Sequence, residues 1–285
     1  MKLIFRKNDS ATSLLMFIYN NYMDKTKQDS MKLSVLLQIL KVFGKNESAI
    51  RMSLSRAVKA GMLINSRHDN EVSYALTTEG KKAIVYWNEG VISFFERYHL
   101  RRAQWDHRWY FLNIDFKEEH REVKAEFLDK LQQRGFAKIN TNTWVTPYYR
   151  NQEIWEIIET YGLSNDTVEI RGEMTIHKDL SEFLNEIYDI EKLRTGYQGF
   201  LDAYANRLQE IRQLCRDESF IQNGLAFPIL HSLGFDFFEI ASDDAVLPKE
   251  LLPEWEGDRA AVILREARKP LLEATHKYLD QFNIL

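Results

Sequence analysis

The sequence lacks most features of secreted, membrane and metal-binding proteins. Its 285 residues include one cysteine, Cys215, so an internal disulfide and a cysteine-built zinc site are both excluded. No run of about 18 apolar residues could cross a membrane. The apolar opening is broken by Arg6, Lys7 and Asp9, which argues against a signal peptide. We therefore expect a cytoplasmic protein that does not contact a membrane.

Motifs of enzymes are also missing. The sequence has no glycine-rich phosphate loop, no GxSxG nucleophile elbow and no HExxH zinc motif. Its seven histidines are scattered, and His107, between Trp105 and Trp109, is best interpreted as a packed polar side chain. We therefore predict that the protein is not an enzyme and has no catalytic residues, metal site or cofactor.

Charge is distributed unevenly along the chain. Residues 1–103 contain 17 Lys and Arg against 9 Asp and Glu, whereas the remainder contains 21 against 33. A basic N-terminal third on an acidic body is typical of a domain that binds a polyanion, joined to domains that bind partners or ligands. The hydrophobic fraction of 45% is sufficient for packed cores, and at this length we expect two or three domains.

The stretch from Gly44 to Gly61 has the pattern of a DNA-reading helix. Ile50, Leu54 and Ala57 fall on one face at helical spacing, with Asn46 placed to cap the start and Gly61 to end the run. The remaining surface is basic and rich in hydroxyls, groups that reach phosphates and base edges in the major groove. A solvated surface helix remains the alternative interpretation of this stretch alone.

The neighbouring segments favour DNA binding. Residues 10–22 and 31–43 are expected helices, and a tight turn at 44–46 leads into the helix described above, which is the order of a helix-turn-helix. Residues 62–76 read as a hairpin, placed where a winged helix has its wing. A long aromatic helix from Gly80 to about Tyr98 follows. The predicted DNA contacts are Lys45, Asn46, Ser48, Arg51, Met52, Ser55, Arg56, Lys59, Arg67 and His68.

The rest of the chain predicts two further domains. After a basic linker at 99–105, strands and helices alternate as β-α-β-β-α-β up to about residue 173, which is the order of a ferredoxin-like domain. Residues from 180 onward read as helices, at 180–193, 197–214, 226–240 and 259–282. The expected class is α+β, with a winged-helix domain at 1–98, a ferredoxin-like domain at 99–176 and a helical domain at 177–285.

Four sequence blocks resemble a known family. Residues 50–63 are similar to V-R-T-A-L-x-R-L-x-K-E-G-W-L, residues 73–80 to S-x-Y-x-L-(S/T)-x-x-G, residues 105–109 to W-D-G-x-W, and residues 244–253 to D-P-x-L-P-x-x-L-L-P. Together, and in this order, they identify the chain as similar to the PaaX-like bacterial transcriptional repressors, named for control of phenylacetic acid degradation. Each block alone is a weak signal.

The resemblance implies a dimeric cytoplasmic repressor that an acyl-CoA thioester releases from a double-stranded DNA operator. Two departures bear on this expectation. The wing tip, residues 68–71, is acidic rather than arginine-rich, and the arginine pair expected before the block at 244–253 is replaced by Phe237-Phe238-Glu239-Ile240. The effector therefore does not follow from the resemblance. As effector-binding residues we select the aromatic and basic side chains Trp105, Arg108, Trp109 and Trp255, for which packing is the alternative interpretation.

Two other functions remain as alternatives. The middle domain resembles small ferredoxin-like nucleases of CRISPR systems, in which an acidic residue at the end of the first strand binds a metal; Asp115 occupies that position. A winged helix can also serve as a protein-interaction module. Such modules lack a basic outward face, whereas Arg51, Arg56 and Lys59 provide one here.

Overall fold

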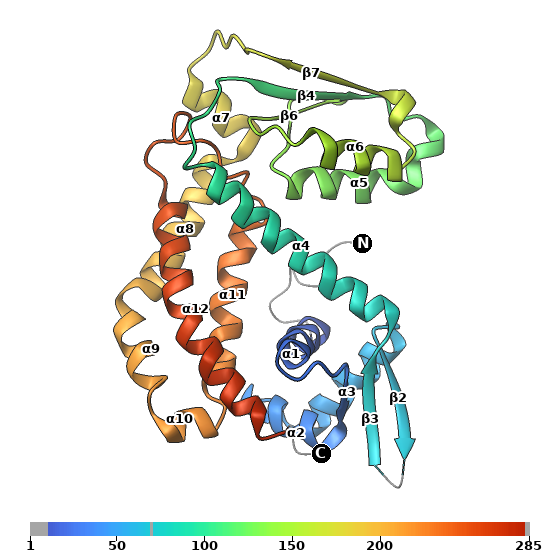
Figure 1. Cartoon of the computed structure of the whole chain (residues 1–285), viewed down its shortest axis with the longest axis vertical. Coiled ribbons are helices and arrows are strands. Elements are labelled where there is room, and N and C mark those ends of the chain that lie inside the picture. The colour runs from blue at the N-terminus through green and yellow to red at the C-terminus, as the bar shows by residue number, and fades with distance from the viewer. Residues whose placement is uncertain (1–10, 69–70, 283–285) are drawn as a thin grey trace. The chain divides into compact units, whose positions relative to one another are not determined.

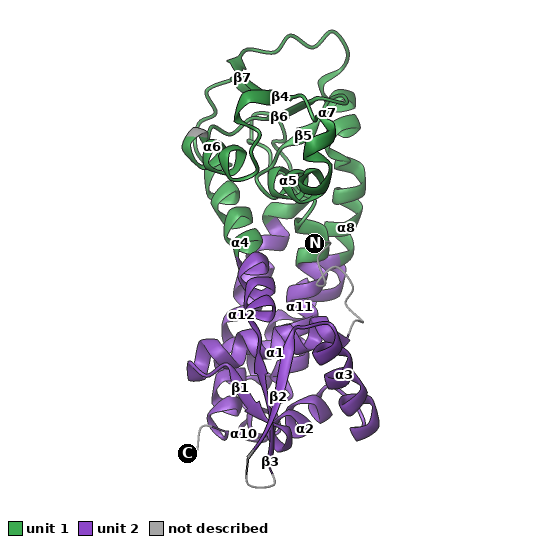
Figure 2. Ribbon diagram, turned by 90° about the vertical axis from the view of Figure 1, so that its right-hand side faces the viewer, with its two compact units in different colours: residues 1, 89–199, 238–258 green, residues 2–88, 200–237, 259–285 purple. Residues whose placement is uncertain are grey.

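The computed structural model describes residues 11–68 and 71–282 (Figure 1). In these ranges the chain is mixed α+β, with two small antiparallel sheets among many helices, which agrees with the expected class. Two compact units can be distinguished, each assembled from segments far apart in the sequence (Figure 2). Unit 1 contains residues 89–199 and 238–258, and unit 2 contains those up to 88, 200–237 and those from 259 onward.

Unit 2 opens with three helices and a small sheet. Its elements are α1 (Ala11–Thr26), β1 (Ser30–Lys32), α2 (Leu33–Val42), α3 (Glu47–Lys59), β2 (Leu63–His68), β3 (Glu71–Leu76) and the start of α4 (Thr78–Leu100). Strands β2 and β3 form the predicted hairpin, paired from Leu63 opposite Leu76 to His68 opposite Glu71.

The predicted helix at 31–43 is shorter than expected. Its first residues join β1, where Met31 lies opposite Tyr74 on β3, and β3 becomes the central strand of the sheet. A long-range strand pairing therefore replaces the first turn of the helix.

The remaining helices of unit 2 come from the C-terminal part of the chain. They are the end of α8 (Ile190–Tyr204), the 3₁₀ turn at Ala205–Arg207, α9 (Leu208–Leu214), α10 (Glu218–Gln222), most of α11 (Ala226–Ala241) and most of α12 (Glu256–Asp280). One buried cluster joins them to the N-terminal helices: it includes Leu15, Ile39 and Ile50 together with Phe227 and Leu279. The N-terminal helices thus share a core with α11 and α12.

Unit 1 contains the second sheet. Its elements are β4 (Trp109–Ile114), a 3₁₀ turn at Glu118–His120, α5 (Arg121–Gln133), β5 (Ala137–Lys138), β6 (Thr143–Thr146), α6 (Asn151–Thr160), a 3₁₀ turn at Ser164–Asp166 and β7 (Thr167–Gly172). The strand order is β5-β6-β4-β7, with every neighbouring pair antiparallel. Its core contains Leu112 and Ile114 of β4, Phe127 of α5 and Ile158 of α6.

Two sequence predictions about unit 1 need correction. The helix expected over 180–193 is interrupted at Asp189, whose positive φ of 51° separates α7 (Leu180–Tyr188) from α8. The expected linker at 99–105 is in part structural, because α4 continues to Leu100 and the side chain of Arg101 is fully buried. Among the described residues, no helix is long and apolar enough to cross a membrane.

Candidate nucleic-acid interface

Helix α3 forms as its local sequence predicts. The side chain of Asn46 caps its start by accepting a hydrogen bond from the N–H of Ala49 at 2.9 Å. Gly61 adopts φ of 71° just after its end, a conformation that glycine adopts without steric cost. Ile50, Leu54 and Ala57 are all 0% exposed. The predicted apolar seam is thus packed into the core, and the rest of the helix surface is left for other contacts.

One side of α3 carries polar groups that face solvent. Ser48, Arg51, Ser55 and Lys59 are all exposed. Arg51 pairs with Glu47 one turn earlier, with Arg51 Nη2 and Glu47 Oε1 2.8 Å apart. Exposed pairs at this spacing contribute only about 0.3–0.5 kcal/mol, so the guanidinium can exchange this partner for a stronger one. This side therefore offers hydroxyls and two cations at the surface.

A neighbouring side of α3 lines a cavity instead. Ala49, Met52, Ser53 and Arg56 follow the spacing i, i+3, i+4, i+7, which places them on one face of the helix. With Lys45 and residues of α1, α2 and α11, they line a cavity of about 440 Å³ that is open to solvent. The predicted DNA contacts on the helix thus divide between an outward face and this cavity face.

The hairpin contributes less than the helix. Arg67 is exposed near the end of β2, whereas the side chain of His68 and residues 69–70 lie outside the described part of the structure. Glu71 pairs with Lys32 of β1 at 3.0 Å. Part of the negative charge expected near the wing tip is therefore compensated within the sheet.

The predicted effector residues at 105–109 pack against one another. The rings of Trp105 and Trp109 meet edge to face with centroids 5.5 Å apart, and Trp109 is 3% exposed. The indole N–H of Trp105 donates to the carbonyl of Arg108, whose side chain is exposed. Aromatic contacts of this geometry stabilise folded chains without a ligand.

Trp255 is also buried, in another part of unit 1. Its indole N–H donates to Asp244 at 3.2 Å, and its ring lies edge to face against Tyr197. Arg194 lies over the same ring, 5.6 Å from its centroid. These contacts hold the segment between α11 and α12 in place, so packing explains Trp255 as well.

Sequence reasoning missed two arginines that organise this segment. Arg101 is 0% exposed, and its guanidinium donates to the carboxylate of Asp258 at 2.9–3.2 Å and to the carbonyls of Leu247 and Leu252. Arg97, 1% exposed, donates to Ser93 and to backbone carbonyls, including that of Asp244. The fold thus uses the basic residues before β4 internally. A basic run read along the chain gives no sign of this.

Burial shifts the pKa values of this cluster. It lowers the pKa of Arg97 to about 10, which leaves the guanidinium charged at neutral pH. Burial raises the pKa of Asp244, opposed by hydrogen bonds from the Val246 N–H, the Tyr197 hydroxyl and the Trp255 indole. The cluster is a buried hydrogen-bond network in which the Nε of Arg97 is left without a partner among the described residues.

Several acidic residues of the middle domain lie after β4 and around His120. Asp115 is exposed after β4, and its backbone N–H donates to the carbonyl of Asp166. His120 Nε2 lies 3.6 Å from oxygens of both Asp166 and Glu119. His120 Nδ1 accepts the Lys117 N–H, which places the ring proton on Nε2, facing the carboxylates; Lys117 Nζ also pairs with Asp166. Glu119, His120 and Asp166 each offer one ligand atom, and these atoms lie within 4.8 Å of one another, close enough for the three side chains to hold a metal ion.

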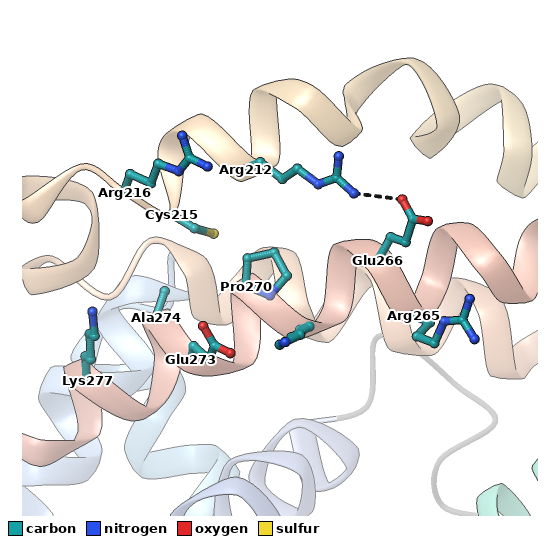
Figure 3. Close-up of a pocket in the computed structure, with 10 residues that line it drawn as sticks. Arg212, Cys215, Arg216, Arg265, Glu266, Pro270, Glu273, Ala274 and Lys277 are labelled. Atoms are coloured by element: carbon teal, nitrogen blue, oxygen red, sulfur yellow. Dashed lines mark hydrogen bonds and ion pairs between the residues drawn. The ribbon is translucent and has the colours of Figure 1, made fainter.

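A second hollow in unit 2, of about 580 Å³, lies between α9 and α12 (Figure 3). Its lining includes five exposed cations: Arg212, Arg216, Arg265, Lys269 and Lys277. Arg212 pairs with Glu266 across the hollow at 2.7 Å. Cys215 lies between the two helices, and burial raises its thiol pKa to about 11, so the thiol stays protonated at neutral pH. The exposed cations make this hollow a basic surface that is open to solvent.

Comparison with known proteins places the chain in a family. Family models match three successive regions: "PaaX-like protein" over residues 10–80, "PaaX protein central Cas2-like domain" over 102–183 and "PaaX-like protein C-terminal domain" over 188–281. No curated protein matches the chain. A solved structure of an uncharacterized protein from Mycobacterium tuberculosis is similar over 88% of this chain and 91% of that chain, with 16% identity and a TM-score of 0.47.

The matches define an α+β protein of several domains with a Cas2-like middle domain. The chain belongs to the PaaX-like family, which confirms the resemblance found in its four sequence blocks. At the level of the family, this membership supports a role in regulating phenylacetate catabolism.

Proposed function

We propose that the protein is a sequence-specific DNA-binding transcriptional regulator, a repressor of a catabolic operon that a small-molecule ligand releases from DNA. The main support for the proposal is the surface of α3. This capped helix buries an apolar seam in the core and exposes hydroxyls and cations to solvent. It follows another helix and precedes a hairpin, as a recognition helix does. The family match over residues 10–80 supports the same reading.

We assign roles to three parts of the chain. Residues 1–98 act as a winged-helix DNA-binding domain, with β2 and β3 as the wing. Residues 99–176 act as a ferredoxin-like domain, supported by the strand order β5-β6-β4-β7 and its antiparallel pairings. We assign dimerisation and ligand response to residues 177–285. The core that α11 and α12 share with the N-terminal helices would connect a ligand bound there to the DNA-binding helices.

Binding to DNA follows from the surface of α3. In a homodimer, two copies of α3 separated by about 34 Å or a multiple of that distance would enter successive major grooves of an inverted repeat. Arg51, Ser55 and Lys59 provide base and phosphate contacts from the outward face. Ser48 and Asn46 lie at the helix start, where free N–H groups favour a phosphate. Arg67 adds a contact from the hairpin.

Salt dependence tests this mode of binding. DNA from upstream of the gene, labelled with a fluorophore, is titrated with the protein at several salt concentrations. We expect affinity to fall linearly on logarithmic axes, by orders of magnitude between 50 and 200 mM salt if about six to ten phosphates are engaged. A footprint and sedimentation analysis then show whether two copies occupy an inverted repeat. No binding to this DNA at any salt concentration would leave the interaction-module function as the better explanation.

The ligand response is a separate part of the proposal. A ligand can release the repressor only through different affinities for its DNA-bound and free forms. The family resemblance points to an acyl-CoA thioester. Trp105, Arg108, Trp109 and Trp255 remain the sequence-based prediction of its site, although the burial of Trp109 and Trp255 favours packing.

We expect the protein to have no nuclease activity. Asp115 stands next to Lys117, which already neutralises the neighbouring Asp166. Protein incubated with labelled DNA or RNA and Mg²⁺ should leave the substrate intact, as should Asp115→Ala. Cleavage by the wild type that the variant has lost would establish the metal-dependent alternative.

A further inference from the structure

The cavity beside α3 lies wholly within unit 2 and joins two distant parts of the chain. Its walls come from the start of α1, the turn between α2 and α3, the cavity face of α3, and Pro228, His231 and Ser232 of α11. Its volume of about 440 Å³ lies in the range of small-molecule sites. A molecule held there would contact the proposed recognition helix and α11 at once.

The cavity combines an apolar lining with two cations. Leu14, Phe43 and Met52 contribute apolar surface, while Lys45 and Arg56 contribute positive charge, and no Asp or Glu is among its lining residues. Among the described residues, neither Lys45 nor Arg56 has a carboxylate within 4 Å, although ion pairs are common elsewhere in the chain. An apolar molecule with one anionic group matches this chemistry.

A buried histidine in the wall lacks a hydrogen bond. His231 is 7% exposed, and its ring packs against Phe17, Phe43 and Phe235. Its Nε2 atom has no partner among the described residues. A buried polar atom left unpaired costs about 1–3 kcal/mol, so natural sites of this kind usually receive a partner. The side chain of His231 is part of the cavity wall, so its replacement changes the surface that a ligand would contact.

The geometry of α3 connects this cavity to DNA. Arg56 and Lys45 line the cavity, yet they also belong to the basic surface predicted to contact DNA. A carboxylate bound by these two side chains would offset their positive charge and repel a nearby phosphate. Occupation of the cavity would therefore weaken the attraction of Arg56 and Lys45 for DNA.

We infer that this cavity binds a small organic carboxylate with an apolar body, and that the bound carboxylate competes with DNA for Arg56 and Lys45. The carboxylate pairs with the two cations, and the apolar body lies against Phe43, Met52 and α11. Binding of the carboxylate does not depend on the proposed function, whereas its effect on DNA binding rests on that function.

Calorimetry with two probes tests the site. We expect 1-naphthoate or octanoate to bind the full-length protein, and the matching neutral amide to bind at least about tenfold more weakly. Ser232→Phe, which fills the cavity from α11, should abolish binding, and Arg56→Ala should weaken it about tenfold. His231→Leu should weaken it several-fold, whereas His276→Leu, in the same unit but outside the cavity, should not. Thermal melts identify any variant that fails to fold.

The same variants separate the site from the DNA-binding function. Saturating carboxylate should weaken DNA binding by the wild type and by His276→Leu, but not by Ser232→Phe. If neither carboxylate binds, or if Ser232→Phe and His231→Leu bind like the wild type, the inference is overturned whatever the DNA result. If carboxylate binds as expected but no DNA is bound at any salt concentration, the site stands and the proposed function fails.

Discussion

The two units differ in how they use arginine: one buries a pair of arginines in its core, and the other exposes a pair at its surface. Arg97 and Arg101 are 1% and 0% exposed, and each holds several carbonyl or carboxylate oxygens. Arg51 and Arg56 lie on the surface of α3, where Arg51 has one exposed ion pair and Arg56 lines a cavity. The same side chain therefore stabilises the fold where it is enclosed and remains free to bind a partner where it is exposed.

The largest effect is expected at the buried pair. Arg101→Ala would leave the carboxylate of Asp258 and two carbonyls without their donor, which should lower the free energy of unfolding by about 3–5 kcal/mol. Urea unfolding followed by circular dichroism measures the loss. Arg102→Ala, at the exposed neighbour, should change stability by no more than about 0.5 kcal/mol. Equal losses in the two variants would remove the contrast between buried and exposed arginines.

His231 sharpens the comparison, because it is a buried base that pairs with no carboxylate among the residues that the structure describes. Burial lowers its pKa to about 4 from 6.5, so the unfolded chain takes up the proton first as the pH falls. The free energy of unfolding should therefore drop between pH 6.5 and pH 4, by up to about 3 kcal/mol from this residue alone. His231→Leu should lose this part of the pH dependence, whereas the exposed His177→Gln should keep it. Identical pH profiles for all three proteins would contradict the assignment.

A smaller effect is expected at the start of α3. Asn46→Ala removes the hydrogen bond that the side chain accepts from the Ala49 N–H, so it should cost about 1 kcal/mol of stability in unit 2. Asn46→Ser retains a capping oxygen and should recover most of that loss. Hydrogen exchange of the first amides of α3 gives the local readout. If both variants exchange like the wild type, the cap does not stabilise this helix.

Local signals made α3 predictable from the sequence. The cap at Asn46, the seam of Ile50, Leu54 and Ala57, and the stop at Gly61 all act within a few residues of one another. The hairpin that follows was predictable for the same reason, because its two strands are adjacent in the chain. Membership of the family was likewise visible in short blocks.

Contacts between distant segments could not be read in the same way. Strand β1 exists because Met31 pairs with Tyr74, more than 40 residues away. The burial of Arg101 depends on Asp258, and the cavity beside α3 depends on α11. The residues next to these positions in the sequence do not indicate which distant segments they contact. The sequence therefore predicted the capped helix and its exposed basic side, but not that a second face of that helix lines a cavity.

The central claim is that the exposed basic side chains of α3 bind DNA, and one measurement tests it most directly. Operator affinity is compared by fluorescence anisotropy for the wild type, Arg51→Ala, Arg56→Ala and the control Lys82→Ala, an exposed cation on α4. We expect the two α3 variants to lose about 1–3 kcal/mol of binding, about 5- to 150-fold, with their thermal melts unchanged. The control should bind like the wild type. Wild-type affinity in both α3 variants would contradict the claim.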